Sequence, residues 1–308
     1  MSSRRGRVRA LALLMGLAGL LGGLGVARAG SLQFCDQPSR LRPAQQGRLL
    51  RVAAQVTDEL DRSGARVALV ARAGLNLGWL GVRYSHAGFS LRESARGPWS
   101  VRQLYYACDE GRPRLFDQGL AGFLFGADDP DGGYLSIVLL PDALAPAVER
   151  EVLDPRQALR VLAPTYSANA YAYGLRYQNC NQWVAEMLAA AQGATADEAG
   201  DARAAAQQWL RGQGYEASVV DLGWAPLTWL TGFSPWLHRD DQPDDDLAAG
   251  RFRVSLPDGI ERFVRATVPG ATRLEVCHTA ERVVIRRGWQ PIADGCVAAP
   301  GDTVLALD

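Results

Sequence analysis

The sequence shows no excess of either charge, because its 308 residues include 33 basic and 33 acidic side chains. A balanced charge argues against the basic surface that a dedicated nucleic-acid-binding protein needs, so nucleic acid is not an expected partner. Histidine is scarce, with three positions, and no internal repeat is visible. Beyond residue 29 there is no apolar run long enough to cross a bilayer. These absences leave a globular chain of one or two domains.

The first 29 residues have the three parts of a secretory signal. Four arginines between residues 4 and 9 precede an apolar run over 11–26, and Ala27-Arg28-Ala29 follows as a small-x-small cleavage site. The alternative is a transmembrane anchor, but the run is short and glycine-rich for a span of roughly 20 residues. The pattern therefore predicts a cleaved signal peptide over 1–29, export to the periplasm, and no stable membrane span after cleavage.

The cysteine count is odd. All five cysteines follow the predicted signal: Cys35, Cys108, Cys180, Cys277 and Cys296. Export to an oxidising compartment favours disulfides. An odd number leaves at least one thiol free or bonded to another chain.

Hydrophobic periodicity predicts an α+β fold. Between residues 30 and 214, helices are expected over 43–61, 115–125, 143–152, 155–163, 179–192 and 201–211, and strands over 67–71, 82–91, 99–108 and 134–140. The composition changes after Gly214. Residues 215–308 are expected to form a smaller C-terminal α+β extension, with strands over 252–256, 273–277, 282–286 and 303–307 and a helix over 257–266.

Cys180 stands at the start of the clearest predicted helix, directly after Asn179, which suits an N-cap. The exposed N–H groups and the dipole of a helix N-terminus favour an anion such as a thiolate. Trp183 and Val184 place the thiol on the apolar side of this helix, facing a sheet. The alternative for an isolated cysteine here is a small buried side chain with no chemistry.

His86 and Gln103 are the candidate partners of Cys180. A base on a strand that faces a nucleophile on a helix is the general Cys/His arrangement, and a third polar group usually orients the imidazole. Gln103 lies on the next predicted strand, where its amide oxygen can accept a hydrogen bond from His86. We expect the Cys180 and His86 side chains at or near hydrogen-bond distance. The alternatives are a core histidine and a solvated glutamine.

Two motifs, in this order, resemble the circularly permuted papain-like enzymes: Tyr84-Ser85-His86-Ala87-Gly88 and Asn179-Cys180-Asn181-Gln182-Trp183-Val184. That group includes permuted NlpC-type hydrolases, lecithin:retinol acyltransferase-like proteins and PPPDE-type thiol peptidases. The chain after the signal also resembles the bacterial family named domain of unknown function 2145. The further motifs that carry this resemblance are Phe34-Cys35, Trp99-Ser100-Val101-Arg102, Asp117-Gln118-Gly119-Leu120, Tyr177-Gln178 and Gly295-Cys296.

The resemblance implies a permuted papain-like core and a secreted cysteine hydrolase or acyl-transfer enzyme. Cys180 would attack an amide or (thio)ester carbonyl, with His86 as general base and Gln103 orienting it. The substrate would be a peptide, a lipid or another acyl-bearing molecule of the cell envelope, and no cofactor or metal is expected. Relatives often carry a histidine at the position of Gln103, and glutamine cannot stabilise an imidazolium as a carboxylate does. The alternative is therefore a non-catalytic periplasmic binding or envelope-assembly module on the same fold.

If Cys180 is the free nucleophile, the simplest disulfide assignment is Cys277 with Cys296 and Cys35 with Cys108, although spacing alone does not determine connectivity. The thiolate of Cys180 should be stabilised by the helix N-terminus and by a protonated His86. Burial beside apolar side chains opposes this effect. We expect stabilisation to dominate and the pKa of the thiol to fall below neutral.

Two further groups have a functional and a structural interpretation. His238 and the acidic residues of 240–246 could bind a metal, but they lack the ligand alternation of a calcium loop, which favours a solvated linker. Trp224, Trp229 and Trp236 could line a ligand groove, although such tryptophans more often pack in a core or between domains.

Overall fold

The computed structural model describes residues 41–194, 200–231 and 234–307. The expected signal peptide and Cys35 lie outside these ranges. Among the described helices, none combines the length and hydrophobicity that crossing a bilayer requires.

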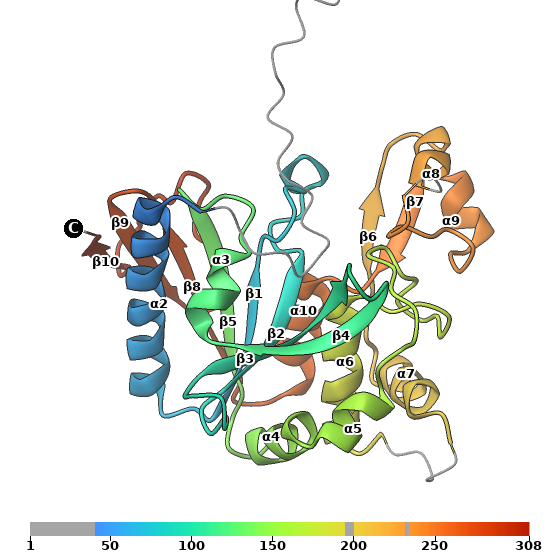
Figure 1. The fold of residues 1–308 in the computed structure, drawn as a ribbon, viewed down its shortest axis with the longest axis horizontal. Coiled ribbons are helices and arrows are strands. Elements are labelled where there is room, and N and C mark those ends of the chain that lie inside the picture. Colours follow the sequence, from blue (N-terminus) through green and yellow to red (C-terminus); the bar gives the residue numbers. More distant parts are fainter. Residues whose placement is uncertain (1–40, 195–199, 232–233, 308) are drawn as a thin grey trace, which may run out of the picture. The chain divides into compact units, whose positions relative to one another are not determined.

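An eight-stranded antiparallel sheet, in the order β10-β9-β8-β5-β1-β2-β3-β4, organises the described part of the chain (Figure 1). Its strands are β1 (Val67–Arg72), β2 (His86–Leu91), β3 (Ser100–Ala107), β4 (Arg112–Gln118), β5 (Gly133–Leu139), β8 (Thr272–His278), β9 (Arg282–Arg287) and β10 (Thr303–Ala306). Two short strands, β6 (Ser218–Asp221) and β7 (Arg251–Val254), pair separately. The expected α+β class is confirmed.

Successive residues of a strand point to opposite faces of the sheet. Because apolar side chains lie on both faces, helices cover both of them. In β1, Val67, Leu69 and Ala71 belong to one core cluster, whereas Ala68 and Val70 belong to the other. The first cluster also contains residues of α4 (Ala145–Leu153), α5 (Pro155–Arg160), α6 (Cys180–Ala191), α7 (Ala202–Gly212) and α10 (Pro257–Thr267). The second contains residues of α2 (Pro43–Ser63) and α3 (Leu120–Phe125). The remaining helices are the 3-10 turn η1 (Gly78–Leu80), α8 (Pro226–Leu230) and α9 (Asp244–Ala248).

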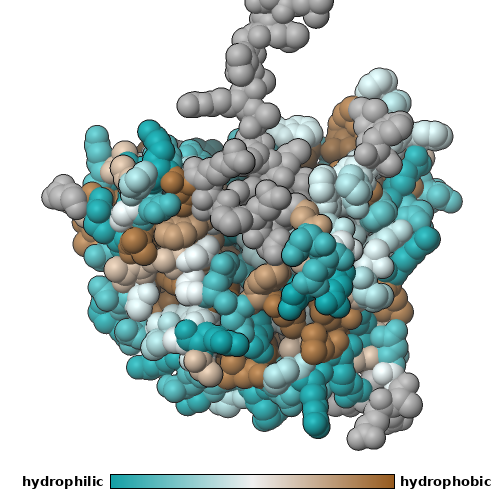
Figure 2. All heavy atoms as spheres, viewed as in Figure 1, coloured by the Kyte–Doolittle hydropathy of each residue, from teal (hydrophilic) through white to brown (hydrophobic). Residues whose placement is uncertain are grey.

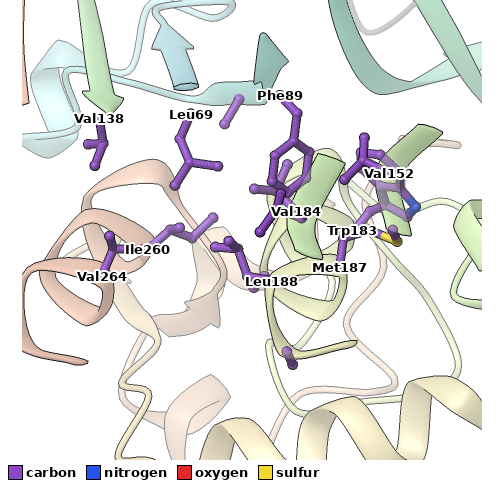
Figure 3. Packing of buried hydrophobic residues seen from close by; sticks show 14 of the residues in the cluster. Leu69, Phe89, Val138, Val152, Trp183, Val184, Met187, Leu188, Ile260 and Val264 are labelled. Atoms are coloured by element: carbon purple, nitrogen blue, oxygen red, sulfur yellow. The ribbon is translucent and has the colours of Figure 1, made fainter. Parts of the chain in front are cut away.

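Helix α6 is held against the sheet by large apolar side chains (Figure 3). The ring of Trp183 meets that of Phe89 on β2 edge to face, with centroids 5.8 Å apart. Leu188 continues the contact towards Ile260 of α10, and Met187 lies on the side of Trp183 and Val152. Burying each such side chain contributes roughly 1.5–3 kcal/mol relative to leaving it exposed. This packing fixes the helix whose first residue is Cys180.

One predicted helix is wrong. Residues 115–125 were expected to form one helix, but Arg112–Gln118 is the edge strand β4 and only Leu120–Phe125 is helical. Leu115 and Phe116 pair with Leu104 and Gln103 of β3. A short apolar run fits either structure, and here the neighbouring strand provides its hydrogen-bond partners.

The expected C-terminal extension shares the main sheet. β8 pairs with β5 along its full length, and β9 and β10 extend that edge. Ile260, Phe263 and Val264 of α10 lie in the same core cluster as α6. Residues on the two sides of Gly214 therefore share one sheet and one core.

The disulfide between Cys277 and Cys296 is present, as expected, with its Cα atoms 5.7 Å apart. Cys180 is a free, buried cysteine. Cys108 is disulfide-bonded, and its expected partner Cys35 lies outside the described residues.

On the face drawn in Figure 2, hydrophilic residues are interspersed with smaller hydrophobic areas. The large apolar side chains that are exposed include Trp79, Trp224 and Trp229, from η1, the turn before α8, and α8 itself.

Candidate functional site

Cys180 is the first residue of α6, as the sequence predicts. The side chain of Asn179 caps the helix by accepting a hydrogen bond from the backbone N–H of Gln182 at 2.7 Å. The Nδ2 of Asn179 donates in turn to the carbonyl oxygen of Ser255 at 3.2 Å. This cap and the buried face of α6 fix the backbone at Cys180.

The thiol of Cys180 lies against the segment that leads into β2. Its side chain is 5% exposed, and Sγ lies 4.0 Å from the carbonyl oxygen of Ser85. Asn181 donates to the same carbonyl through Nδ2 at 3.0 Å. The start of α6 is thereby tied to the residue preceding His86.

The expected contact between His86 and Gln103 is present. Nε2 of His86 lies 2.6 Å from Oε1 of Gln103, and both side chains are buried. A carboxamide oxygen only accepts hydrogen bonds, so Nε2 carries the proton in this arrangement. The lone pair of the imidazole is then on Nδ1.

The imidazole and the thiol do not form the expected hydrogen bond. The ring of His86 stacks on Tyr105 at 4.5 Å and lies 5.9 Å from Phe123 of α3, on the face of the sheet that α2 and α3 cover. Its neighbour Ala87 faces α6. Because side chains alternate along β2, His86 begins on the opposite side of the sheet from the core that surrounds Cys180. No hydrogen bond between the two side chains occurs among the described residues.

Cys180 and His86 nevertheless line one small cavity at the end of the sheet. The cavity has a volume of about 60 Å³ and lies where β1 ends and β2 begins. A cavity of this size holds only a few water molecules or one small chemical group. Its polar walls include Arg72, His86, Tyr105, Tyr166, Cys180 and Asn181.

Burial controls the ionisation of both candidate groups. It raises the pKa of the Cys180 thiol to about 11, although the backbone N–H groups of Ala87 and Asn181 and the charge of Arg72 act in the opposite direction. The expected pKa below neutral is therefore wrong. Burial, followed by the charge of Arg72, lowers the pKa of His86 to about 3, while the hydrogen bond to Gln103 raises it. Both groups are neutral at pH 7.

One family model matches the chain over residues 59–264, and its description is "Uncharacterized protein conserved in bacteria (DUF2145)". The match covers His86, Gln103 and Cys180. The chain belongs to this family. No curated protein and no solved structure matches it.

In this DUF2145 protein, sequence reasoning overlooked Arg72 as a member of the site. Arg72 pairs directly with His86 across β1 and β2, and it lines the cavity. The available signal was an arginine directly after the apolar run Val67–Ala71, where a charge would be buried if the strand continued by one residue.

The acidic segment of the DUF2145 protein makes structural contacts. His238 stacks on Tyr177, with ring centroids 4.2 Å apart, and Asp241 accepts a hydrogen bond from the backbone N–H of Tyr171 at 2.8 Å. Within the described ranges, no three His, Cys, Asp or Glu side chains gather as a metal site. Trp224 and Trp229 are exposed and do not line the cavity.

Proposed function

We propose that this protein is an exported cysteine hydrolase or acyl-transfer enzyme. Cys180 is the nucleophile, His86 the general base and Gln103 the residue that orients the base. One observation carries the proposal: the free cysteine at the start of α6 shares a cavity with a histidine whose Nε2 is held by a buried amide. The fold that we propose for this core is the circularly permuted papain-like one.

The reaction begins from a neutral thiol and a neutral imidazole. As Sγ attacks the carbonyl carbon of an amide or (thio)ester, Nδ1 of His86 takes the thiol proton. The carbonyl oxygen becomes an oxyanion, which the backbone N–H groups of Cys180 and Asn181 at the start of α6 stabilise. His86 then protonates the leaving group, and water or another acceptor takes the acyl group from Sγ.

Attack requires Sγ and Nδ1 to approach each other from their present positions. Catalytic contacts are often loose without substrate and tighten when it binds. Because the thiol is not ionised in advance, His86 must remove its proton during attack. We propose a peptide, a lipid or another acyl-bearing molecule of the cell envelope as substrate, in keeping with the expected export.

A second candidate function is a non-catalytic binding module. The absence of a hydrogen bond between Cys180 and His86 favours it, as does the burial of the thiol. Such a module would keep the cavity, but the reactivity of Cys180 would not depend on His86.

Alkylation of the non-reduced native protein separates the two candidates. Iodoacetamide should label Cys180 selectively, as mass spectrometry of the peptides would show, and His86→Ala should slow the labelling by about tenfold or more because the base is lost. Gln103→Ala should slow it less, since the amide only orients the ring. His278→Ala is the matched control, because His278 is buried but lies outside the cavity. If His86→Ala reacts as fast as the wild type, His86 is not the base.

A further inference from the structure

Arg72, the last residue of β1, is a buried cation with no acidic partner among the described residues. Its side chain is 2% exposed, and within the described ranges no carboxylate forms an ion pair with it. Arginine is almost never fully buried unless it is paired, because an uncompensated charge is costly to remove from water. The attraction of Arg72 reaches the carboxyl of Asp128 and opposes the rise that burial causes in its pKa, but the two groups do not bond.

Neutral groups hold the guanidinium of Arg72 in place. Nη2 donates to the hydroxyl of Tyr105, and Nη1 donates to the carbonyl oxygen of Gly126. The ring of Phe123 lies below it, with its centroid 5.0 Å from Cζ. Nε has no partner. These contacts position the cation but leave its charge uncompensated.

Two glycines make room for this guanidinium. A Cβ at Gly74 would lie 2.9 Å from Nη1, and a Cβ at Gly126 would lie 2.9 Å from Cζ and still closer to Nη2. Gly126 has a φ of −86°, which any residue can adopt, so a larger residue here would act by displacing the guanidinium of Arg72. The residues around Arg72 therefore enclose its guanidinium closely.

The other arginines that are buried within the described ranges are paired with carboxylates. Arg203 bonds Glu186 at 2.9 Å, and Arg273 bonds Glu261 at 2.9 Å. Arg72 departs from this pattern, and it does so in the wall of the cavity that contains Cys180.

We propose that Arg72 binds a carboxylate of the substrate, so that the enzyme selects acyl donors with an anionic group beside the bond that is cleaved. The acyl-transfer part of this statement rests on the proposed function, whereas anion binding does not. A cavity of about 60 Å³ admits a carboxylate but not a large headgroup. A guanidinium suits a planar carboxylate, because its N–H groups can donate to both oxygens.

Arg72 could instead act only on the thiolate of Cys180, and a pair of alkylating reagents separates these roles. Iodoacetate carries a carboxylate, and iodoacetamide is its neutral analogue. Both alkylate the same sulfur with loss of iodide, so the ionisation of the thiol affects both rates equally and cancels in their ratio. The ratio therefore reports the preference of the cavity for an anion.

The experiment compares native protein with the same protein unfolded in urea without reductant. We expect the iodoacetate-to-iodoacetamide rate ratio at Cys180 to be at least about tenfold higher in the native state, because a buried cation attracts the anionic reagent. Arg72→Gln should lower the ratio to the unfolded value, and Arg72→Lys should give an intermediate one. Arg176→Gln removes an exposed positive charge outside the cavity and should leave the ratio unchanged.

A native ratio equal to or below the unfolded value overturns anion binding, even if Arg72→Gln fails to fold. Failure of both reagents to reach native Cys180 overturns it too, because the cavity then admits no ligand. A ratio that stays high in folded Arg72→Gln assigns the preference to another group and also rejects the proposal. The dependence of the iodoacetamide rate on His86 is a separate result, so the proposed function can fail or survive independently.

Discussion

Burial shifts the ionisation of Cys180 and His86 in opposite directions, and both shifts favour the neutral forms. The thiolate loses hydration, which raises the pKa of Cys180, and the imidazolium loses hydration next to the charge of Arg72, which lowers the pKa of His86. A neutral pair reacts only when the proton moves as the new bond forms. A substrate anion bound to Arg72 would partly cancel the charge that disfavours the imidazolium, and so would make His86 a stronger base.

The pH dependence of alkylation tests this description. The pre-formed thiolate adds a second, faster route beside the one assisted by His86, and because the pKa of Cys180 is about 11, the rate with iodoacetamide should still be rising at pH 10. Arg72→Gln should move the curve to higher pH, since the charge of Arg72 lowers this pKa. In the urea-unfolded protein the same thiol should show its inflection near 8.5, the ordinary value for cysteine. An inflection below pH 7 in the native wild type would contradict the neutral pair.

The site residues that the sequence predicts correctly are those marked by a pattern in their own segment of the chain. Cys180 follows a capping Asn179, and Gln103 contacts His86 as the strand pattern suggested. Arg72 and Tyr105 were overlooked, because their contact is made through space across 33 positions. The pKa of Cys180 was predicted in the wrong direction, since the depth of its burial depends on elements distant in the sequence.

The pairing of β2 with β3 is the element contact that positions Gln103 on His86. Gly88 is the residue of β2 at which this strand approaches β3 closely in the region of Gln103. A Cβ at Gly88 would lie 2.8 Å from the carbonyl oxygen of Arg102 and 3.1 Å from the Cβ of Gln103. Glycine at this position therefore permits the close approach of the two strands.

Gly88→Ala should strain this strand pair. Overpacking of a buried position typically costs about 1–3 kcal/mol, so we expect a loss of that size in the free energy of unfolding measured with urea. Displacement of Gln103 should also slow alkylation of Cys180. Gly212→Ala in α7 is the matched control, because its Cβ would meet no atom within 4 Å, and it should be neutral or stabilising by up to about 1 kcal/mol. Equal stabilities for the two variants would show that β3 shifts without cost.

Elements with strong periodicity were predicted well, and the ambiguous ones were not. Helices α2 and α6 have long apolar faces and clear ends, which local sequence specifies. β4 was read as part of a helix, because its few apolar residues fit both periods and β3 decides between them. The short strand β6 was not predicted, since it depends on pairing with β7.

The chain order of the strands does not follow their order in the sheet. β1 lies between β2 and β5, and β5 then pairs with β8, which is 133 positions later when counted from Leu139 to Thr272. The change of composition at Gly214 suggested a boundary, but composition carries no information about which strands pair. The sheet and the core are completed only when residues after 214 are added.

A chain ending at residue 214 should therefore not fold by itself. It would lack β8, which occupies one edge of β5, and α10, whose Ile260 and Val264 help to cover α6. An exposed strand edge and an uncovered apolar core favour unfolding or aggregation. We expect fragment 30–214 to show no cooperative thermal transition by circular dichroism, and mixing it with fragment 215–308 should restore the transition and the iodoacetamide reactivity of native Cys180. If fragment 30–214 alone unfolds cooperatively and labels like the full protein, residues 215–308 form a separable extension.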